Sequence, residues 1–123
     1  MSKTVLIVDD SLFMRTLIKK ALISGGFEVV GEATNGEEAL DMAFEHLPDY
    51  ITLDNILPDM IGTDILAIFK EEDLPSKVLL ISAVGQKSVV EQGISLGAIG
   101  YLVKPFEAEE LIATLSEHEN QMS

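Results

Sequence analysis

Near its N-terminus the chain reads Thr4-Val5-Leu6-Ile7-Val8-Asp9-Asp10. Residues 4–8 are apolar or β-branched without interruption, which is typical of a strand covered on both faces. A half-exposed strand would instead alternate apolar with polar side chains. The segment therefore predicts a buried strand at residues 4–9 that ends in two neighbouring carboxylates.

The same unit, a short apolar strand followed by an amphipathic helix, recurs five times along the chain. Further strands are predicted at residues 28–33, 50–54, 77–82 and 99–103. Apolar residues at helical spacing predict helices at residues 11–24, 35–47, 61–69, 86–96 and 108–115. Five such units predict one α/β domain over residues 1–123, a doubly wound parallel sheet with helices on both faces.

Helix ends are predicted from capping residues. Ser11 is an N-cap candidate, and Gly25-Gly26 ends the first helix. Asn35 followed three residues later by Glu38 is a capping signal for the second helix. The buried stripe of that helix is expected to reach Leu47, and residues 117–123 are expected to be a frayed tail.

Composition excludes several classes of protein. Hydrophobic residues make up 47% of the chain, which argues against disorder, and zero cysteines exclude disulfides and thiolate metal sites. The net charge of −13 predicts no binding to nucleic acid or to anionic membranes. With neither a signal peptide nor an apolar run of membrane-spanning length, the protein is expected to be cytoplasmic.

Polar side chains stand at the carboxyl ends of four predicted strands, the edge at which open α/β sheets bind ligands. They are Asp9 and Asp10 after the first strand, Asp54 after the third, Ser82 after the fourth and Lys104 after the fifth. Clustered carboxylates repel one another, and Mg²⁺ would relieve that repulsion while taking a phosphate oxygen as a further ligand. A carboxylate can also attack phosphorus, with Lys104 offsetting the charge and Ser82 bonding a phosphoryl oxygen.

These residues resemble the motifs of the response-regulator receiver family over nearly the whole chain. The matching motifs are Asp9-Asp10 after an apolar strand, Asp54 in LDNILPDMIG, the pair Ser82-Ala83, and GYLVKPF with Tyr101, Lys104 and Pro105. The resemblance implies the flavodoxin-like (βα)5 fold with strand order 2-1-3-4-5.

The resemblance also implies a role for each site residue. Asp54 would be the phosphoacceptor, and Asp9, Asp10, Asp54 and the main-chain carbonyl of Ile56 would bind Mg²⁺, with Asp10 a direct ligand. Ser82 would be the switch hydroxyl, Tyr101 the aromatic that turns inward when Ser82 moves, and Lys104 the phosphoryl contact. A cis peptide bond is implied between Lys104 and Pro105. The family carries polar side chains in some members where this chain has Ile56 and Val84, two positions that can place a hydrolytic water.

Within the family, the segment DDSLFMR and the lack of an output domain resemble the single-domain chemotaxis regulators of the CheY group. The partners implied are a CheA-like histidine kinase, a motility or motor-associated target protein and an auxiliary phosphatase, with the regulator itself a monomer. Such a protein is a regulatory switch rather than an enzyme.

The target-binding face is expected on the fourth helix, the fifth strand and the fifth helix. Val89 and Leu96 form one apolar row on that helix, and Val90 and Ile94 form another about 100° away. One stripe suffices to pack on a sheet, so one row should stay exposed, and the resemblance favours Val90 and Ile94. Tyr101 and Val103 would extend this face along an edge strand.

Three residues outside these motifs need an interpretation. His46 and His118 are expected to be solvated surface residues. Phe13 lies about 100° off the buried stripe of its helix, so it either packs under a loop or is an exposed contact.

Two other functions fit parts of the pattern, and one alternative lies within the family. A haloacid-dehalogenase-like phosphatase would need a second Asp two residues after Asp54, where this chain has Ile56. A flavodoxin-like cofactor binder is disfavoured because the acidic edge would repel a cofactor phosphate. A phosphorelay intermediate, or a receiver cut from a longer regulator, shares the same motifs.

Overall fold

The computed structural model describes residues 2–83 and 87–122. Within these residues five strands alternate with five helices. The strands are β1 (Thr4–Val8), β2 (Glu28–Ala33), β3 (Tyr50–Asp54), β4 (Lys77–Ala83) and β5 (Gly100–Lys104). The helices are α1 (Leu12–Ser24), α2 (Gly36–His46), α3 (Gly62–Glu71), α4 (Lys87–Ser95) and α5 (Ala108–Met122). None of the described helices has the length and apolar character needed to cross a membrane.

The strands form one parallel sheet in the order β2-β1-β3-β4-β5, which confirms the predicted topology. β1 lies between β2 and β3, and its last residue, Val8, pairs with Ala33 on one side and Leu53 on the other. β2 and β5 are the edge strands. The order reverses between β1 and β3, so the topological switch point lies where Asp9 and Asp54 end their strands.

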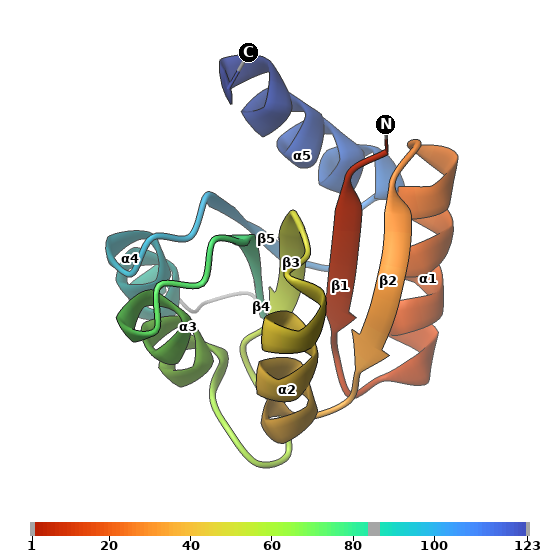
Figure 1. Ribbon diagram of the computed structural model, residues 1–123. Coiled ribbons are helices and arrows are strands. Elements are labelled where there is room, and N and C mark those ends of the chain that lie inside the picture. The colour runs from red at the N-terminus through yellow and green to blue at the C-terminus, as the bar shows by residue number, and fades with distance from the viewer. Residues whose placement is uncertain (1, 84–86, 123) are drawn as a thin grey trace.

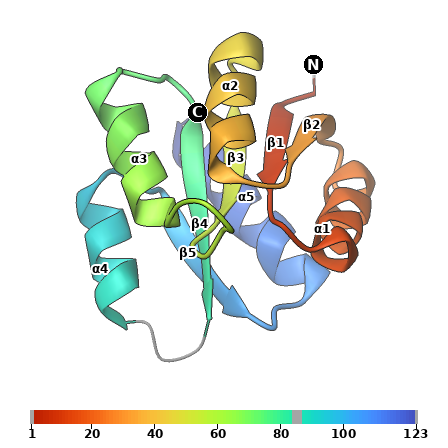
Figure 2. The same cartoon turned by 90° about the horizontal axis from the view of Figure 1, so that it is seen from below.

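Helices cover both faces of the sheet (Figures 1 and 2). α1 and α5 pack on one face, over a buried cluster that includes Ile7, Ile18 and Leu111. α2, α3 and α4 cover the other, over a cluster that includes Leu6, Leu53 and Leu80. Both faces of β1 are therefore buried, as its uninterrupted apolar run predicts.

Most of the predicted helix caps are confirmed. The hydroxyl of Ser11 accepts a hydrogen bond from the amide of Met14 (3.3 Å), and α1 ends at Gly25. The Asn35 side chain accepts from the amide of Glu38 (2.8 Å). In a capping box the Glu38 carboxylate would accept a hydrogen bond from the amide of Asn35. In the structure it accepts from the amide of Thr34 instead (2.7 Å), one residue earlier.

Two predictions about helix ends are wrong. α2 stops at His46, and Leu47 takes a left-handed conformation (φ 46°) with 54% of its surface exposed, so it does not continue the buried stripe. Residues 117–122 are helical rather than frayed, because α5 continues to Met122.

Contacts with Tyr50 explain the extra turns of α5. Its hydroxyl lies 3.1 Å from Nδ1 of His118 and donates to the carboxylate of Glu119, and its ring packs edge-on against that of His118. His118 is consequently half-buried, contrary to the prediction, whereas His46 is exposed as predicted. Phe13 is 66% exposed on α1, which decides between its two interpretations in favour of an exposed residue.

Candidate functional site

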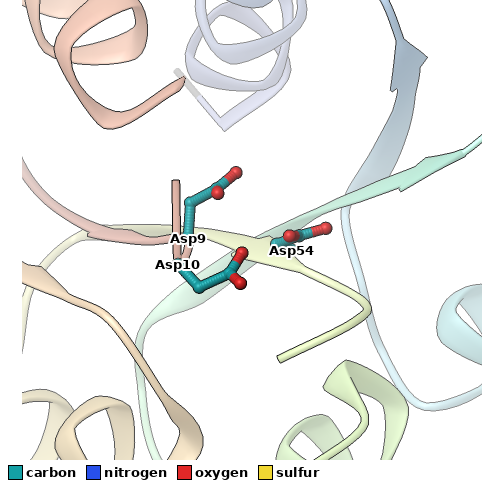
Figure 3. A group of neighbouring side chains, drawn as sticks. All are labelled: Asp9, Asp10 and Asp54. Carbon is teal, nitrogen blue, oxygen red and sulfur yellow. The ribbon is translucent and has the colours of Figure 1, made fainter. Parts of the chain in front are cut away.

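The three predicted acids meet at the carboxyl edge of the sheet (Figure 3). Asp9 and Asp10 directly follow β1, and Asp54 is the last residue of β3. Each offers one carboxylate oxygen, and these oxygens lie within 4.8 Å of one another. Asp9 and Asp54 are buried while Asp10 is exposed, so the cluster opens to solvent on the Asp10 side.

Main-chain and side-chain bonds fix Asp9 in place. Its amide donates to the carbonyl of Ala33 at the end of β2 (3.0 Å). One carboxylate oxygen, Oδ1, accepts from the amide of Ser11 (2.8 Å), and the other, Oδ2, accepts from Nζ of Lys104 (3.1 Å). Both oxygens of the buried carboxylate therefore have a hydrogen-bond partner, as a buried charge requires.

Lys104 joins the two buried acids, because its Nζ also lies 3.3 Å from Oδ2 of Asp54. Burial by itself lowers the pKa of this ammonium group. Attraction to Asp54 and the hydrogen bond to Asp9 outweigh burial, so the pKa of Lys104 lies above its ordinary value. The residue therefore carries a positive charge at neutral pH, directly beside the Asp54 carboxylate.

Asp54 shows the opposite balance. Burial raises the pKa of its carboxyl group, the charge of Asp9 raises it further, and Lys104 offsets only part of the rise. The negative charge of ionised Asp54 is therefore only partly balanced by positive charge among the described residues. A group that brings positive charge to the open side of the cluster would be stabilised there.

Ser82 has a buried hydroxyl without a hydrogen-bond partner among the described residues. It lies on β4 one position beyond Ile81, the residue that pairs with Asp54. An unpaired buried hydroxyl is costly and calls for an explanation. The hydroxyl of Thr52, two residues before Asp54, is likewise buried and unpaired.

The loop between β3 and α3 is held at its base and at its tip. At the base, the amide of Gly62 donates to the carbonyl of Asn55, and a bridge joins Ile56 to Ile61. At the tip, the Asp59 carboxylate accepts from the amides of Gly36 (2.7 Å) and Glu37 (3.0 Å) at the start of α2. These backbone bonds hold the pKa of Asp59 below its usual value.

Ile56, whose carbonyl is a predicted Mg²⁺ ligand, lies in this held loop with its side chain 60% exposed. Val84, the other apolar position singled out in the sequence, lies outside the described residues. The peptide bond between Lys104 and Pro105 is cis, as the family resemblance implied.

The residues of the expected target-binding face lie on α4 and β5. Ile94 and Tyr101 are 47% and 48% exposed, and Val90 and Val103 are half-buried. Val89 and Leu96 pack against the core cluster under α2, α3 and α4, so they form the inner row of α4.

Two residues with a direct bearing on the site were missed in the sequence. Asp59 and Arg15 each reach the backbone of another element, Asp59 at α2 and Arg15 at the carbonyl of Asp9 (2.8 Å). Only Arg15 could have been noticed from the sequence. It is one of three basic residues on α1, a helix that has no acidic residue although the chain as a whole is strongly acidic.

The acid cluster suits a hard divalent cation. Mg²⁺ binds oxygen ligands, and it commonly uses one or two carboxylates together with waters and phosphate oxygens. Three acids at the ends of two adjacent strands, one of them open to solvent, can supply these carboxylates. The negative charge of Asp54, which Lys104 balances only in part, also favours a cation at this edge.

The arrangement defines a class of protein. A buried carboxylate between a lysine and an acid pair, at the switch point of a 2-1-3-4-5 sheet, is the layout of a phosphorylatable receiver. The family model for the response regulator receiver domain matches residues 5–116. The chain therefore belongs to the response regulator receiver family, whose general mechanism is phosphorylation of an aspartate.

Individual relatives narrow the comparison. The chemotaxis protein CheY of Bacillus subtilis (strain 168) is 41% identical over 117 residues, which cover 95% of this chain and 98% of that protein. CheY of Thermotoga maritima is 40% identical with the same coverage. A chain in the crystal structure of the CheX–CheY–BeF3–Mg²⁺ complex from Borrelia burgdorferi has a TM-score of 0.90 and 32% identity, covering 95% of this chain and 89% of that one.

Proposed function

We propose that this protein is a CheY-like regulator that a histidine kinase phosphorylates on Asp54 in a Mg²⁺-dependent reaction. The observation that carries the proposal is the contact between the buried Asp54 carboxylate and Lys104, with Asp9 and Asp10 beside it. Its phosphorylated form would then bind a target protein. In this account the protein assists its own phosphorylation and dephosphorylation but turns over no separate substrate, and we expect it to act in the cytoplasm as a monomer.

Each side chain has a chemical task in the proposed reaction. A carboxylate oxygen of Asp54 attacks the phosphorus atom, an acyl phosphate bond forms, and the bond from phosphorus to the donor's leaving group breaks. Asp9, Asp10, Asp54 and the Ile56 carbonyl would hold Mg²⁺, which when bound neutralises charge on the transferring group. Lys104 adds positive charge from the protein side, already within 3.3 Å of Asp54.

The unpaired hydroxyl of Ser82 supports its assignment as the switch. A phosphoryl oxygen on Asp54 would give this hydroxyl the partner that it lacks among the described residues. Movement of Ser82 toward the phosphoryl group would leave space for the exposed ring of Tyr101 to turn inward. The surface of Val90, Ile94, Tyr101 and Val103 would change shape as a result, as a shift between two populated states.

A role in chemotaxis or motility is supported by relatives named CheY that match along almost their whole length. The kinase would then be CheA-like and the target motor-associated. The Borrelia complex pairs a CheY with CheX, and this likeness supports an auxiliary partner for the present chain, which we expect to be a phosphatase.

Two alternatives predict different behaviour. A phosphorelay intermediate or a receiver within a longer regulator would use the same site and differ only in where the phosphoryl group or signal goes next. A phosphatase with an aspartyl nucleophile is less well supported, because Ile56 stands where such an enzyme needs its second acid.

Labelling stoichiometry separates the regulator from the phosphatase. The protein would be incubated with Mg²⁺ and acetyl phosphate, and separately with phosphoesters, while bound and released phosphate are measured. A regulator should accept at most one phosphoryl group per chain and release no phosphate from the esters. Many turnovers on phosphoesters would contradict the proposal. Transfer of the label from Asp54 to a histidine protein would favour the relay.

A further inference from the structure

Arg15, in the first turn of α1, contacts the main chain of the acid pair without belonging to the pair. Its Nη1 donates to the main-chain carbonyl of Asp9 (2.8 Å), and its Nε donates to Oε1 of Glu32 on β2 (3.2 Å). Only 12% of the Arg15 side chain is exposed. Charge-assisted hydrogen bonds of this shielded kind are stronger and more directional than neutral ones.

The carbonyl of Asp9 belongs to the peptide unit that joins Asp9 to Asp10. A peptide unit is planar, so fixing its carbonyl oxygen also fixes the direction in which the chain enters Asp10. Asp9 is further held by Ala33, Ser11 and Lys104. The Asp10 side chain, by contrast, has no hydrogen bond or ion pair within residues 2–83 and 87–122. The placement of the Asp10 carboxylate therefore depends on the peptide unit that Arg15 holds.

We propose that Arg15 is a positioning residue for the cation site: its guanidinium fixes the Asp9–Asp10 peptide unit and thereby the spacing of the two carboxylates. The inference rests on the Mg²⁺ binding put forward under the proposed function. Arg15 acts through the backbone and makes no contact with the carboxylates themselves.

The contacts of Arg15 require a guanidinium group, because two of its nitrogens bind different partners at the same time. One nitrogen bonds Asp9 while another is anchored to Glu32, and Glu32 also receives Nζ of Lys19 at 3.5 Å. A lysine at position 15 would keep the charge but could not serve both partners with fixed geometry. Residues that orient metal ligands from outside typically change metal affinity by about 10- to 100-fold when removed.

Charge and positioning predict opposite effects, which makes the inference testable. Removing a positive charge near an acidic cation site should strengthen Mg²⁺ binding, because like charges repel. Loss of positioning should weaken it. Lys19 supplies a matched control, since it is a cation on the same helix that contacts Glu32 but makes no hydrogen bond to Asp9.

The experiment is a calorimetric titration of Mg²⁺ into the wild type, Arg15→Met, Arg15→Lys and Lys19→Met, with Asp10→Ala defining the site. Both Arg15 variants should bind Mg²⁺ about tenfold more weakly or worse, while Lys19→Met should bind as the wild type does or more tightly. In the metal-free proteins, the amide NMR signal of Asp10 should shift in both Arg15 variants and stay in place in Lys19→Met.

The outcomes separate this inference from the proposed function. Wild-type affinity in both Arg15 variants would overturn the positioning role while leaving the cation site intact. A wild type whose Mg²⁺ binding is unaffected by Asp10→Ala would overturn the proposed site and this inference with it. Thermal melts without Mg²⁺ identify any variant that fails to fold, and if Arg15→Met is unfolded, Arg15→Lys decides the matter.

Discussion

Asp54 combines two properties that usually conflict, a buried position and a negative charge. Burial and the neighbouring Asp9 raise its pKa, and the attraction of Lys104 reverses only part of the rise. The folded protein therefore holds a proton on Asp54 more tightly than the unfolded chain does. Ionised Asp54 consequently costs stability at neutral pH, and protonated Asp54 does not. The ionised form of the proposed phosphoacceptor is thus not stabilised by the fold alone.

Asp54→Asn should accordingly stabilise the metal-free protein at pH 7, because it removes a buried carboxylate whose ionisation the fold disfavours. The gain should shrink as the pH falls through the folded-state pKa of Asp54, and it should vanish below the unfolded-state value, where Asp54 is protonated in both states. Thermal melts of both proteins across this pH range, without divalent cations, provide the measurement. A variant less stable than the wild type at pH 7 would mean that the ion pair with Lys104 outweighs burial.

Asp10 differs from Asp54 because it is exposed and makes no hydrogen bond among the described residues. Asp10→Ala should leave the melting temperature of the metal-free protein unchanged or slightly raised, since an exposed acid beside two others is removed. The same change should abolish tight Mg²⁺ binding. Calorimetry and a melt test both halves, and a large fall in melting temperature would show that Asp10 is chiefly structural.

At the level of elements, the loop from Asp54 to Gly62 brings the start of α3 close to the backbone of Asp54, the proposed phosphoacceptor. A Cβ atom on Gly62 would lie 2.8 Å from both the carbonyl oxygen of Asp54 and Cα of Asn55. Both neighbours are backbone atoms, so a side chain at this position cannot be accommodated by a rotamer change. Glycine at position 62 is therefore required by close packing beside the site.

Gly62→Ala should destabilise the fold by about 1–3 kcal/mol, in spite of the better helix propensity of alanine. It should also slow labelling of Asp54 by acetyl phosphate, because the loop that carries Ile56 must move. Gly31→Ala is the control, since the nearest atom there, on Leu6, lies 3.4 Å away and belongs to a side chain. Equal stability of the two variants would show that the loop yields without cost.

The elements also show what the sequence could and could not predict. Strand positions, the Ser11 and Asn35 caps and the end of α1 depend on neighbours within a few residues, so local patterns predicted them. The last turns of α5 depend on Tyr50, and the Asp59 bond to α2 joins residues 22 and 23 positions apart. Such contacts carry no periodic signal, and neither does the contact of Arg15 with the Asp9 carbonyl.

For the molecule as a whole, strand order decides which side chains meet. The four strands β1, β3, β4 and β5 are consecutive in the sheet, and their parallel arrangement brings their carboxyl ends to one edge. Asp9 directly follows β1, and Asp54, Ser82 and Lys104 lie at or near the ends of the other three. The order of five βα units in the sequence is therefore enough to predict this convergence. The tasks of these residues remain predictions that rest on the family resemblance.

The same architecture separates the proposed phosphorylation site at Asp54 from the expected target-binding residues on α4 and β5. Val90→Asp should abolish binding of the native partner to the phosphorylated protein, and Tyr101→Ala should weaken it, because Ile94 and Tyr101 form the exposed part of that face. Binding would be measured on folded, fully phosphorylated proteins. The control is Phe13→Ala, a change to a large exposed residue on α1, which should bind normally. Normal binding by both test variants would place the output face elsewhere.

The most direct test of the whole account is the intact mass of the protein after incubation with acetyl phosphate, with and without Mg²⁺. The account predicts the addition of one phosphoryl group, dependent on Mg²⁺, mapped to Asp54 and absent from Asp54→Asn. Equal labelling of Asp54→Asn, or full labelling of the wild type without a divalent cation, would contradict it.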